Sequence, residues 1–143
     1  MLTITKVRKT FNKGTINEKK ALNGIDLHLD EGDFCTIIGG NGAGKSTMLN
    51  MIAGVYPIDC GKIVIDGVNI SREPEFRRAK YIGRVFQDPK KGTCDGLTIL
   101  ENMALADNKH KAYGLSRGVN KRRTDYYRTL LETCGMGLED RLN

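Results

Sequence analysis

The chain has 143 residues, of which 39% are hydrophobic and 28% are charged, so it is long enough for one ordinary domain with a real core. No signal peptide opens the chain and no apolar run approaches the roughly 20 residues of a membrane-spanning helix, so we expect any membrane role to come through a partner. The net charge is +6, but the basic residues are spread out with few aromatic residues between them, which argues against nucleic acid as a partner. No cysteines form a C-x-x-C pair, which argues against a zinc site.

The first 38 residues predict paired strands. Residues 2–8 form a β-prone run, and from Leu22 to Asp30 apolar residues alternate with polar ones. This period of two predicts a half-buried antiparallel strand. Residues 34–38, Phe-Cys-Thr-Ile-Ile, are apolar and β-prone, which predicts a buried parallel strand.

Residues 39–47, GGNGAGKST, match the pattern G-x-x-x-x-G-K-[ST] of a phosphate-binding loop. Gly42 and Gly44 lack Cβ atoms, so the loop can curl tightly and point successive backbone N–H groups at an anion. A helix that begins near Lys45 adds its N-terminal dipole. We expect Lys45 to reach the β- and γ-phosphates of ATP, Ser46 to ligate Mg²⁺ and Thr47 to help hold the α-phosphate. The nucleotide-binding residues predicted from this loop are Gly39, Asn41, Gly42, Ala43, Gly44, Lys45, Ser46 and Thr47.

The segment after the loop predicts a helix, a hairpin and a further strand. The apolar residues between Met48 and Ala53 suit one face of a helix that ends at Gly54. Asp66-Gly67 between two β-prone runs is typical of a hairpin turn. Ser71 is expected to cap a short helix, and residues 81–86 predict a strand that ends at Gln87.

Two helices are predicted in the last third of the chain. Thr98 and Glu101 fit a capping box that opens a helix to about Ala106. Asn120 is expected to cap a second helix, which Gly135 and Gly137 end. The buried stripe predicted for this second helix consists of Tyr127, Leu130, Leu131 and Cys134.

Several motifs follow one another in an order and at spacings that are typical of one protein family. They are Phe11, residues 21–34, the loop at 39–47, GKIVIDG at 61–67, VFQDP at 85–89 and LTILEN at 97–102. With them the chain resembles the first part of the nucleotide-binding domain of an ATP-binding cassette (ABC) ATPase. The resemblance implies an α/β P-loop NTPase fold of the ABC type with an incomplete core sheet. It implies an antiparallel β subdomain (1–33 and 60–70), a P-loop core (34–59 and 71–87) and the start of a helical subdomain (88–143).

The resemblance also implies roles for two residues outside the loop. Phe11 matches the aromatic residue that stacks on adenine, although an ordinary hydrophobic residue of a hairpin is the alternative. Gln87 matches the glutamine that touches Mg²⁺ or the attacking water, although a polar strand end is the alternative. The predicted catalytic residues are therefore Lys45 and Gln87, and the predicted Mg²⁺ ligands are Ser46 and Gln87. The segment after Gln87 resembles the region that meets a transmembrane partner.

Several elements that the family needs have no match in the sequence. Asp66 follows an apolar run like the family's metal-binding aspartate, but Gly67 stands where the catalytic glutamate belongs. Residues 115–119 resemble the LSGGQ signature, but Arg117 and Val119 depart from it. We therefore expect a truncated ATPase, which binds ATP but does not turn it over alone.

The resemblance implies the ATP-binding subunit of a membrane transporter, expected to be a bacterial importer of amino acids or similar small solutes. Its expected partners are a transmembrane permease subunit, a second copy of the ATPase and a periplasmic or extracellular solute-binding protein. Its expected location is cytoplasmic, at the inner face of the cell membrane. The alternatives are a soluble ABC protein without a transmembrane partner and a nucleotide-binding fragment without turnover. A small P-loop kinase would leave the hairpins and VFQDP unexplained.

Overall fold

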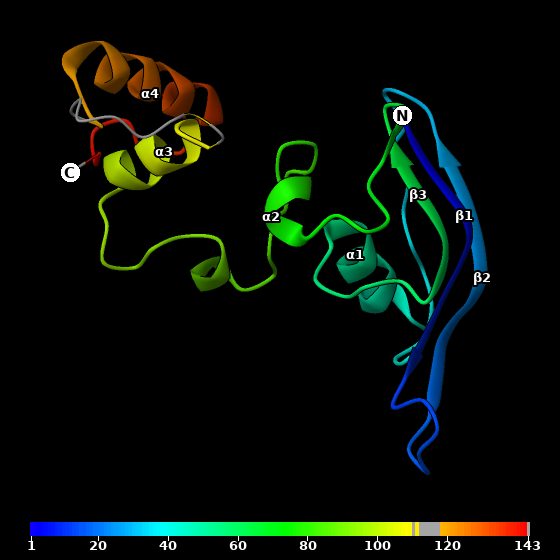
Figure 1. Cartoon of the computed structure of the whole chain (residues 1–143). Helices are drawn as coiled ribbons and strands as arrows, with labels where there is room; N and C mark the ends of the chain where they lie inside the picture. The colour runs from blue at the N-terminus through cyan, green and yellow to red at the C-terminus, as the bar shows by residue number, and fades with distance from the viewer. Residues whose placement is uncertain (110, 112–117, 143) are drawn as a thin grey trace. The chain divides into compact units, whose positions relative to one another are not determined.

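The computed structural model describes residues 1–109, 111 and 118–142. They fall into two compact units, Met1–Gly83 and Arg84–Asn143 (Figure 1). The first unit is built on an antiparallel sheet and the second on a pair of helices. None of the helices in the described part of the chain has both the length and the hydropathy to cross a bilayer.

The first unit contains a four-stranded antiparallel sheet with the strand order β2-β1-β3-β4. The strands are β1 (Leu2–Phe11), β2 (Lys19–Leu29), β3 (Cys60–Ile65) and β4 (Val68–Asn69). Apolar and exposed polar residues alternate along most of β2, which confirms the predicted half-buried strand. Helix α1 (Lys45–Ala53) packs on the sheet (Figure 1). Its Met51 is buried in one hydrophobic cluster with Ile4 and Ile63.

The predicted hairpin after β3 is confirmed. Val64 and Ile65 of β3 pair with Asn69 and Val68 of β4. The two turn residues, Asp66 and Gly67, have φ values of 47° and 79°. Two successive positive φ values are what the two-residue turn of type I′ requires, and this explains the Asp-Gly pair.

Ser71 does not cap a helix, so that prediction is wrong. The next helix, α2 (Glu75–Arg78), has Pro74 at its N-cap position. The Ser71 hydroxyl instead accepts a hydrogen bond from the backbone N–H of Ile63 at 2.8 Å and donates one to the Asn69 side chain at 2.6 Å. Because these two hydrogen bonds occupy the Ser71 hydroxyl, it is not available to cap the N-terminus of α2.

Arg78 joins α2 to the end of α1. Its side chain is 1% exposed, and its guanidinium donates hydrogen bonds to four backbone carbonyls. The acceptors are Met51 at 2.7 Å, Ile52 at 3.0 Å, Glu73 at 2.7 Å and Ser71 at 3.1 Å. Burial lowers the pKa of Arg78 below its usual value. A positive charge at the last turn of α1 also suits the negative end of the helix dipole.

Two predicted strands of the core are absent. Residues 34–38 and 81–86 form no strand, and Phe34 is 94% exposed, Ile38 90% and Val85 98%. A strand needs a neighbour for its backbone N–H and C=O groups, and no described segment pairs with either run. The parallel part of the core sheet is therefore incomplete, as the fold class predicted.

The described part of the second unit contains a short 3₁₀ turn at Pro89–Lys91 and two helices, α3 (Ile99–Asp107) and α4 (Lys121–Cys134). The capping box of α3 is confirmed, because the Thr98 side chain accepts from the N–H of Glu101 and the Glu101 carboxylate accepts from the N–H of Thr98. Asn120 caps α4 by accepting from the N–H of Arg123 at 3.0 Å. Gly135 ends α4 with a φ of 62°.

The buried face of α4 is narrower than predicted. Tyr127 and Leu131 are buried with Leu100 and Ala104 of α3. Leu130 is 40% exposed and Cys134 is exposed, so the prediction was wrong for these two. The buried pair lies four residues apart and forms one ridge toward α3, whereas the wider predicted stripe assumes a second packed neighbour.

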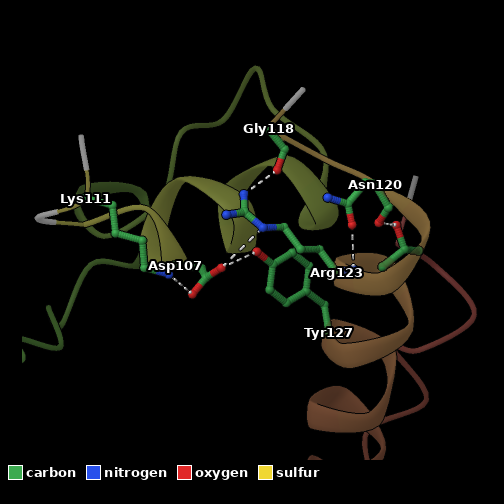
Figure 2. Close-up of polar contacts among 7 residues, drawn as sticks. Asp107, Lys111, Gly118, Asn120, Arg123 and Tyr127 are labelled. Carbon is green, nitrogen blue, oxygen red and sulfur yellow. Dashed lines mark hydrogen bonds and ion pairs between the residues drawn. The ribbon is translucent and has the colours of Figure 1, made fainter. Parts of the chain in front are cut away.

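A polar cluster links α3 to α4 (Figure 2). The Asp107 carboxylate accepts hydrogen bonds from the Tyr127 hydroxyl at 2.9 Å and the Lys111 ammonium at 2.9 Å. The Arg123 guanidinium lies 3.8 Å from the same carboxylate. The hydrogen bond from Lys111 is the main cause of the lowered pKa of Asp107, while burial and Asp107 raise the pKa of Tyr127. The cluster gives the hydroxyl of the buried Tyr127 a hydrogen-bond partner on α3.

Candidate nucleotide-binding site

A pocket of about 290 Å³ lies between the tip of the β1–β2 hairpin and the loop that enters α1. Its walls come from parts of the chain that are distant in sequence, the ends of two strands and the predicted phosphate-binding loop. The lining residues are Phe11, Lys19, Ala21, Asn41, Gly42, Ala43, Gly44, Lys45, Ser46 and Thr47. The structure therefore brings Phe11 to the loop, and its role as a base-stacking residue stays a prediction.

The loop backbone depends on glycine. Gly42 and Gly44 have φ values of 82° and 92°, in the left-handed region that side chains disfavour. A Cβ on Gly44 would lie 2.7 Å from the backbone oxygen of Ala21 and 2.9 Å from the Leu22 side chain. Strand β2 thus lies directly against the loop and leaves no room for a side chain there.

The start of α1 has an anion-binding character. Gly44 is the N-cap residue and carries no capping side chain, so no side chain of the helix competes for the first-turn N–H groups. Ser46 and Thr47 lie in that first turn and line the pocket. N–H groups without a capping side chain, together with the helix dipole, favour a phosphate at this place.

Lys45 lies across the loop. Its ammonium donates to the carbonyl oxygens of Gly39 at 2.5 Å and Gly40 at 2.9 Å. Gly39 itself does not line the pocket, and its link to the site is this hydrogen bond. An ammonium has three donors, so Lys45 can hold the loop and still present a hydrogen to a phosphate oxygen.

Phe11 is the last residue of β1, and its neighbours fix the ring. Tyr56 meets it edge to face, with ring centroids 5.3 Å apart and planes at 83°. The Lys9 ammonium lies 5.5 Å from the Phe11 ring centroid. An aromatic ring held at the mouth of a phosphate-binding pocket can stack on a flat base.

Comparison with known proteins identifies the family. Residues 22–141 match the family described as ABC transporter. The chain belongs to this family. Its fold is accordingly the α/β P-loop fold of ABC cassettes, with part of the core sheet missing.

Among curated relatives, this ABC chain is 35% identical over 143 residues to the tyrosine transport ATP-binding protein of Clostridioides difficile (strain R20291). That alignment covers 100% of the chain and 57% of the relative. The chain is also 30% identical to the bacitracin export ATP-binding protein BceA of Halalkalibacterium halodurans, and that alignment covers 88% of the chain and 54% of the relative. The chain thus spans a little over half the length of these relatives.

Among solved structures, the ABC chain is similar to a dimeric ATP-binding cassette in a post-hydrolysis state bound to ADP and phosphate. The TM-score is 0.75 at 29% identity, and the match covers 100% of the chain and 60% of that cassette. Binding of ADP and dimerisation are properties of that protein, and they support proposals about this one.

Gln87 belongs to the second unit of this ABC chain, whereas the pocket lies in the first. Its contact with Mg²⁺ or with water therefore stays a prediction. The roles assigned to the loop residues, Lys45 included, and to Phe11 also stay predictions, although the pocket gathers all of them except Gly39.

Asp66 does not belong to the pocket. Its carboxylate lies 2.6 Å from the N-terminal ammonium of Met1, at the start of β1. Phe11 and the pocket lie at the other end of this ten-residue strand, about 30 Å away. Residues 115–117 of the signature-like segment lie outside the described residues, so that resemblance has no structural test.

Sequence reasoning missed Lys19 and Ala21, which both line the pocket. The signal was present in the hairpin pattern. Residues two apart on a strand share one face, and Lys19 lies opposite Phe11 in the β1–β2 register. Once Phe11 is assigned to the site, these two residues of β2 follow.

Proposed function

We propose that this chain binds Mg-ATP in the pocket and is the nucleotide-binding part of a transporter ATPase. The observation that carries the proposal is the meeting of Phe11, on a strand end, with the glycine loop and the first turn of α1. The base stacks on Phe11, the phosphates lie on the loop, and the Ser46 hydroxyl is one ligand of Mg²⁺. Phosphate oxygens and water complete the shell that Mg²⁺ prefers.

The proposed substrate class is amino acids or similar small solutes, and the proposed direction is import into a bacterial cell. The relative named for tyrosine transport aligns with the whole chain, whereas the one named for bacitracin export aligns with less of it at lower identity. This ranking favours an amino acid over a peptide antibiotic. The proposed partners are a permease, a second ATPase copy and an extracellular or periplasmic solute-binding protein, with the chain at the cytoplasmic face of the membrane.

The test of nucleotide binding is a titration with a fluorescent ATP analogue in the presence of Mg²⁺. We expect Lys45→Ala to weaken binding about tenfold or more, because a charge-assisted contact contributes about 1.5–3 kcal/mol. Since Lys45 also holds two loop carbonyls, the thermal melting of both proteins is measured in parallel. Equal affinities for the parent and a folded Lys45→Ala variant would refute the proposal.

We further propose that the 143-residue chain does not hydrolyse ATP at a steady rate by itself. Hydrolysis needs a group that positions the attacking water beside the held γ-phosphate. No described carboxylate lines the pocket, and Asp66 lies at the far end of β1. Phosphate release by the purified chain is expected to equal that of Lys45→Ala, which controls for contaminating ATPases. Turnover that disappears in Lys45→Ala would contradict this expectation.

The second unit offers a surface for the proposed permease. A groove of about 470 Å³ runs beside the start of α3, and its apolar lining includes Leu97, Ile99 and Met103. The Asn102 amide donates to the carbonyls of Cys94 and Leu97 and so holds the loop that forms one wall. We propose that a cytoplasmic helix of the permease lies in this groove, in the manner of an amphipathic helix on an apolar surface.

Cys94 lines this groove and is exposed, so it reports on the groove directly. Two variants would be made, one that keeps only Cys94 and one that keeps only Cys134, an exposed cysteine of α4. Assembly with the transmembrane subunit is expected to slow maleimide labelling of Cys94 at least tenfold and to leave Cys134 unchanged. Unchanged labelling of Cys94 in the assembled transporter would exclude the groove as the docking surface.

A further inference from the structure

We propose that Lys19 is a second phosphate-binding lysine of the nucleotide site, acting from the hairpin side of the pocket. This inference rests on the proposed function. Lys19 lines the pocket together with the loop. Its ammonium lies close to the loop backbone, because a Cβ built on Gly42 would be 3.8 Å from it. The cation therefore lies beside the loop at Gly42, where the phosphates are proposed to bind.

The β1–β2 register explains how Lys19 reaches the loop. Lys19 is the first residue of β2 and lies directly opposite Phe11. Directly opposed residues of an antiparallel pair project on the same face, with Cβ atoms about 5 Å apart. The hairpin thus presents an aromatic ring and an ammonium side by side, one suited to a base and the other to the phosphates attached to it.

The charges around Lys19 favour an anion. Within residues 1–109, 111 and 118–142, Lys19 has no ion pair. The other charged residue of the pocket is Lys45, so the pocket carries two positive charges and no described carboxylate. Two like charges near one loop are unfavourable until a polyanion lies between them. A nucleotide with two or three phosphates supplies that charge.

Lys20 is the natural control. It is adjacent, exposed and equally charged, but it projects from the opposite face of β2 and does not line the pocket. Lys19→Met and Lys20→Met each remove one charge and keep most of the side-chain length. Any difference between them therefore reports on the position of the charge and not on the net charge of the protein.

The experiment measures the affinities of the 143-residue chain for ATP, ADP and adenosine by competition with a fluorescent ATP analogue. Lys19 is exposed, so the expected loss in Lys19→Met is moderate, about fivefold for ATP, smaller for ADP and absent for adenosine. The loss should shrink as salt rises, because screening weakens an exposed charge contact. Lys19→Arg should restore ATP binding, and Lys20→Met should match the parent.

Three results separate the possible failures. If Lys45→Ala weakens ATP binding and Lys19→Met does not, the inference about Lys19 is wrong and the proposed function stands. If neither variant changes ATP binding, the proposed function fails as well. If Lys19→Met weakens ATP and adenosine equally, Lys19 shapes the base pocket, as Phe11→Ala is expected to do, and is not a phosphate contact.

Discussion

Replacing Gly44 by alanine is expected to lower the affinity for ATP about a hundredfold. At its φ of 92° a side chain is strained, and the new Cβ would lie 2.7 Å from the Ala21 backbone oxygen. Backbone strain and overpacking each contribute about 1–3 kcal/mol, and a loss of about 3 kcal/mol corresponds to the stated change. The loop and β2 must move apart, which distorts the phosphate cradle.

Gly40→Ala is the matched control for this experiment. Gly40 belongs to the same loop, but a Cβ there would meet no atom of the described residues within 4 Å. Both variants would be titrated with the ATP analogue and melted in parallel. Parental affinity in Gly44→Ala would show that the close contact with β2 is not needed. An equal loss of affinity in Gly40→Ala would mean that the loop tolerates no substitution. The contact between Gly44 and β2 would then not be the cause of the loss.

Replacing Arg78 by methionine is expected to destabilise the first unit by about 3 kcal/mol. The change removes four hydrogen bonds from a guanidinium that is 1% exposed and takes this donor away from two carbonyls of α1, of which Met51 keeps a hydrogen bond from the N–H of Gly54. An unsatisfied buried polar group costs about 1–3 kcal/mol. Partial relaxation of the structure keeps the total loss of stability below the sum of the individual costs. The free energy of unfolding in urea measures the effect, and hydrogen exchange of residues 45–53 locates it in α1.

Arg77→Met is the control for this prediction. The Arg77 side chain is 64% exposed, and its contact with Glu73 is a long surface pair of 3.4 Å. Such pairs contribute between 0 and about 1 kcal/mol, so little change is expected. Arg78→Lys should rescue only part of the loss, because one ammonium cannot reach four carbonyls. A loss in Arg78→Met no larger than in Arg77→Met would show that the buried network adds nothing to stability.

Features that depend on a few neighbouring residues were predictable. The capping box of Thr98 and Glu101, the cap at Asn120 and the Asp66-Gly67 turn all form within five residues, and all are confirmed. The phosphate-binding loop is also local, because its glycines, lysine and helix start are contiguous. The pocket accordingly gathers Phe11 and the predicted loop residues from Asn41 to Thr47, whereas Gly39 and Gln87 do not line it and the residues of β2 were missed. The roles predicted for these residues stay predictions.

Features that depend on residues distant in the chain were not predictable from the sequence. Residues 34–38 have the composition of a buried strand, yet composition cannot supply the neighbouring strand whose backbone they would pair with. Ser71 has the residue type of a helix cap, but the N–H of Ile63 and the Asn69 side chain compete for its hydroxyl. Leu130 fits the period of α4, but its exposure depends on how many elements pack against that helix.

The sequence by itself determined the family and the loop that defines it, because backbone geometry and phosphate chemistry restrict those nine positions directly. Only the tertiary structure decided which lysine of β2 faces the loop, that Arg78 is buried on the end of α1, and that Asp66 lies a strand's length from the pocket. Strand register and packing set these distances, and both arise from contacts between residues far apart in the chain.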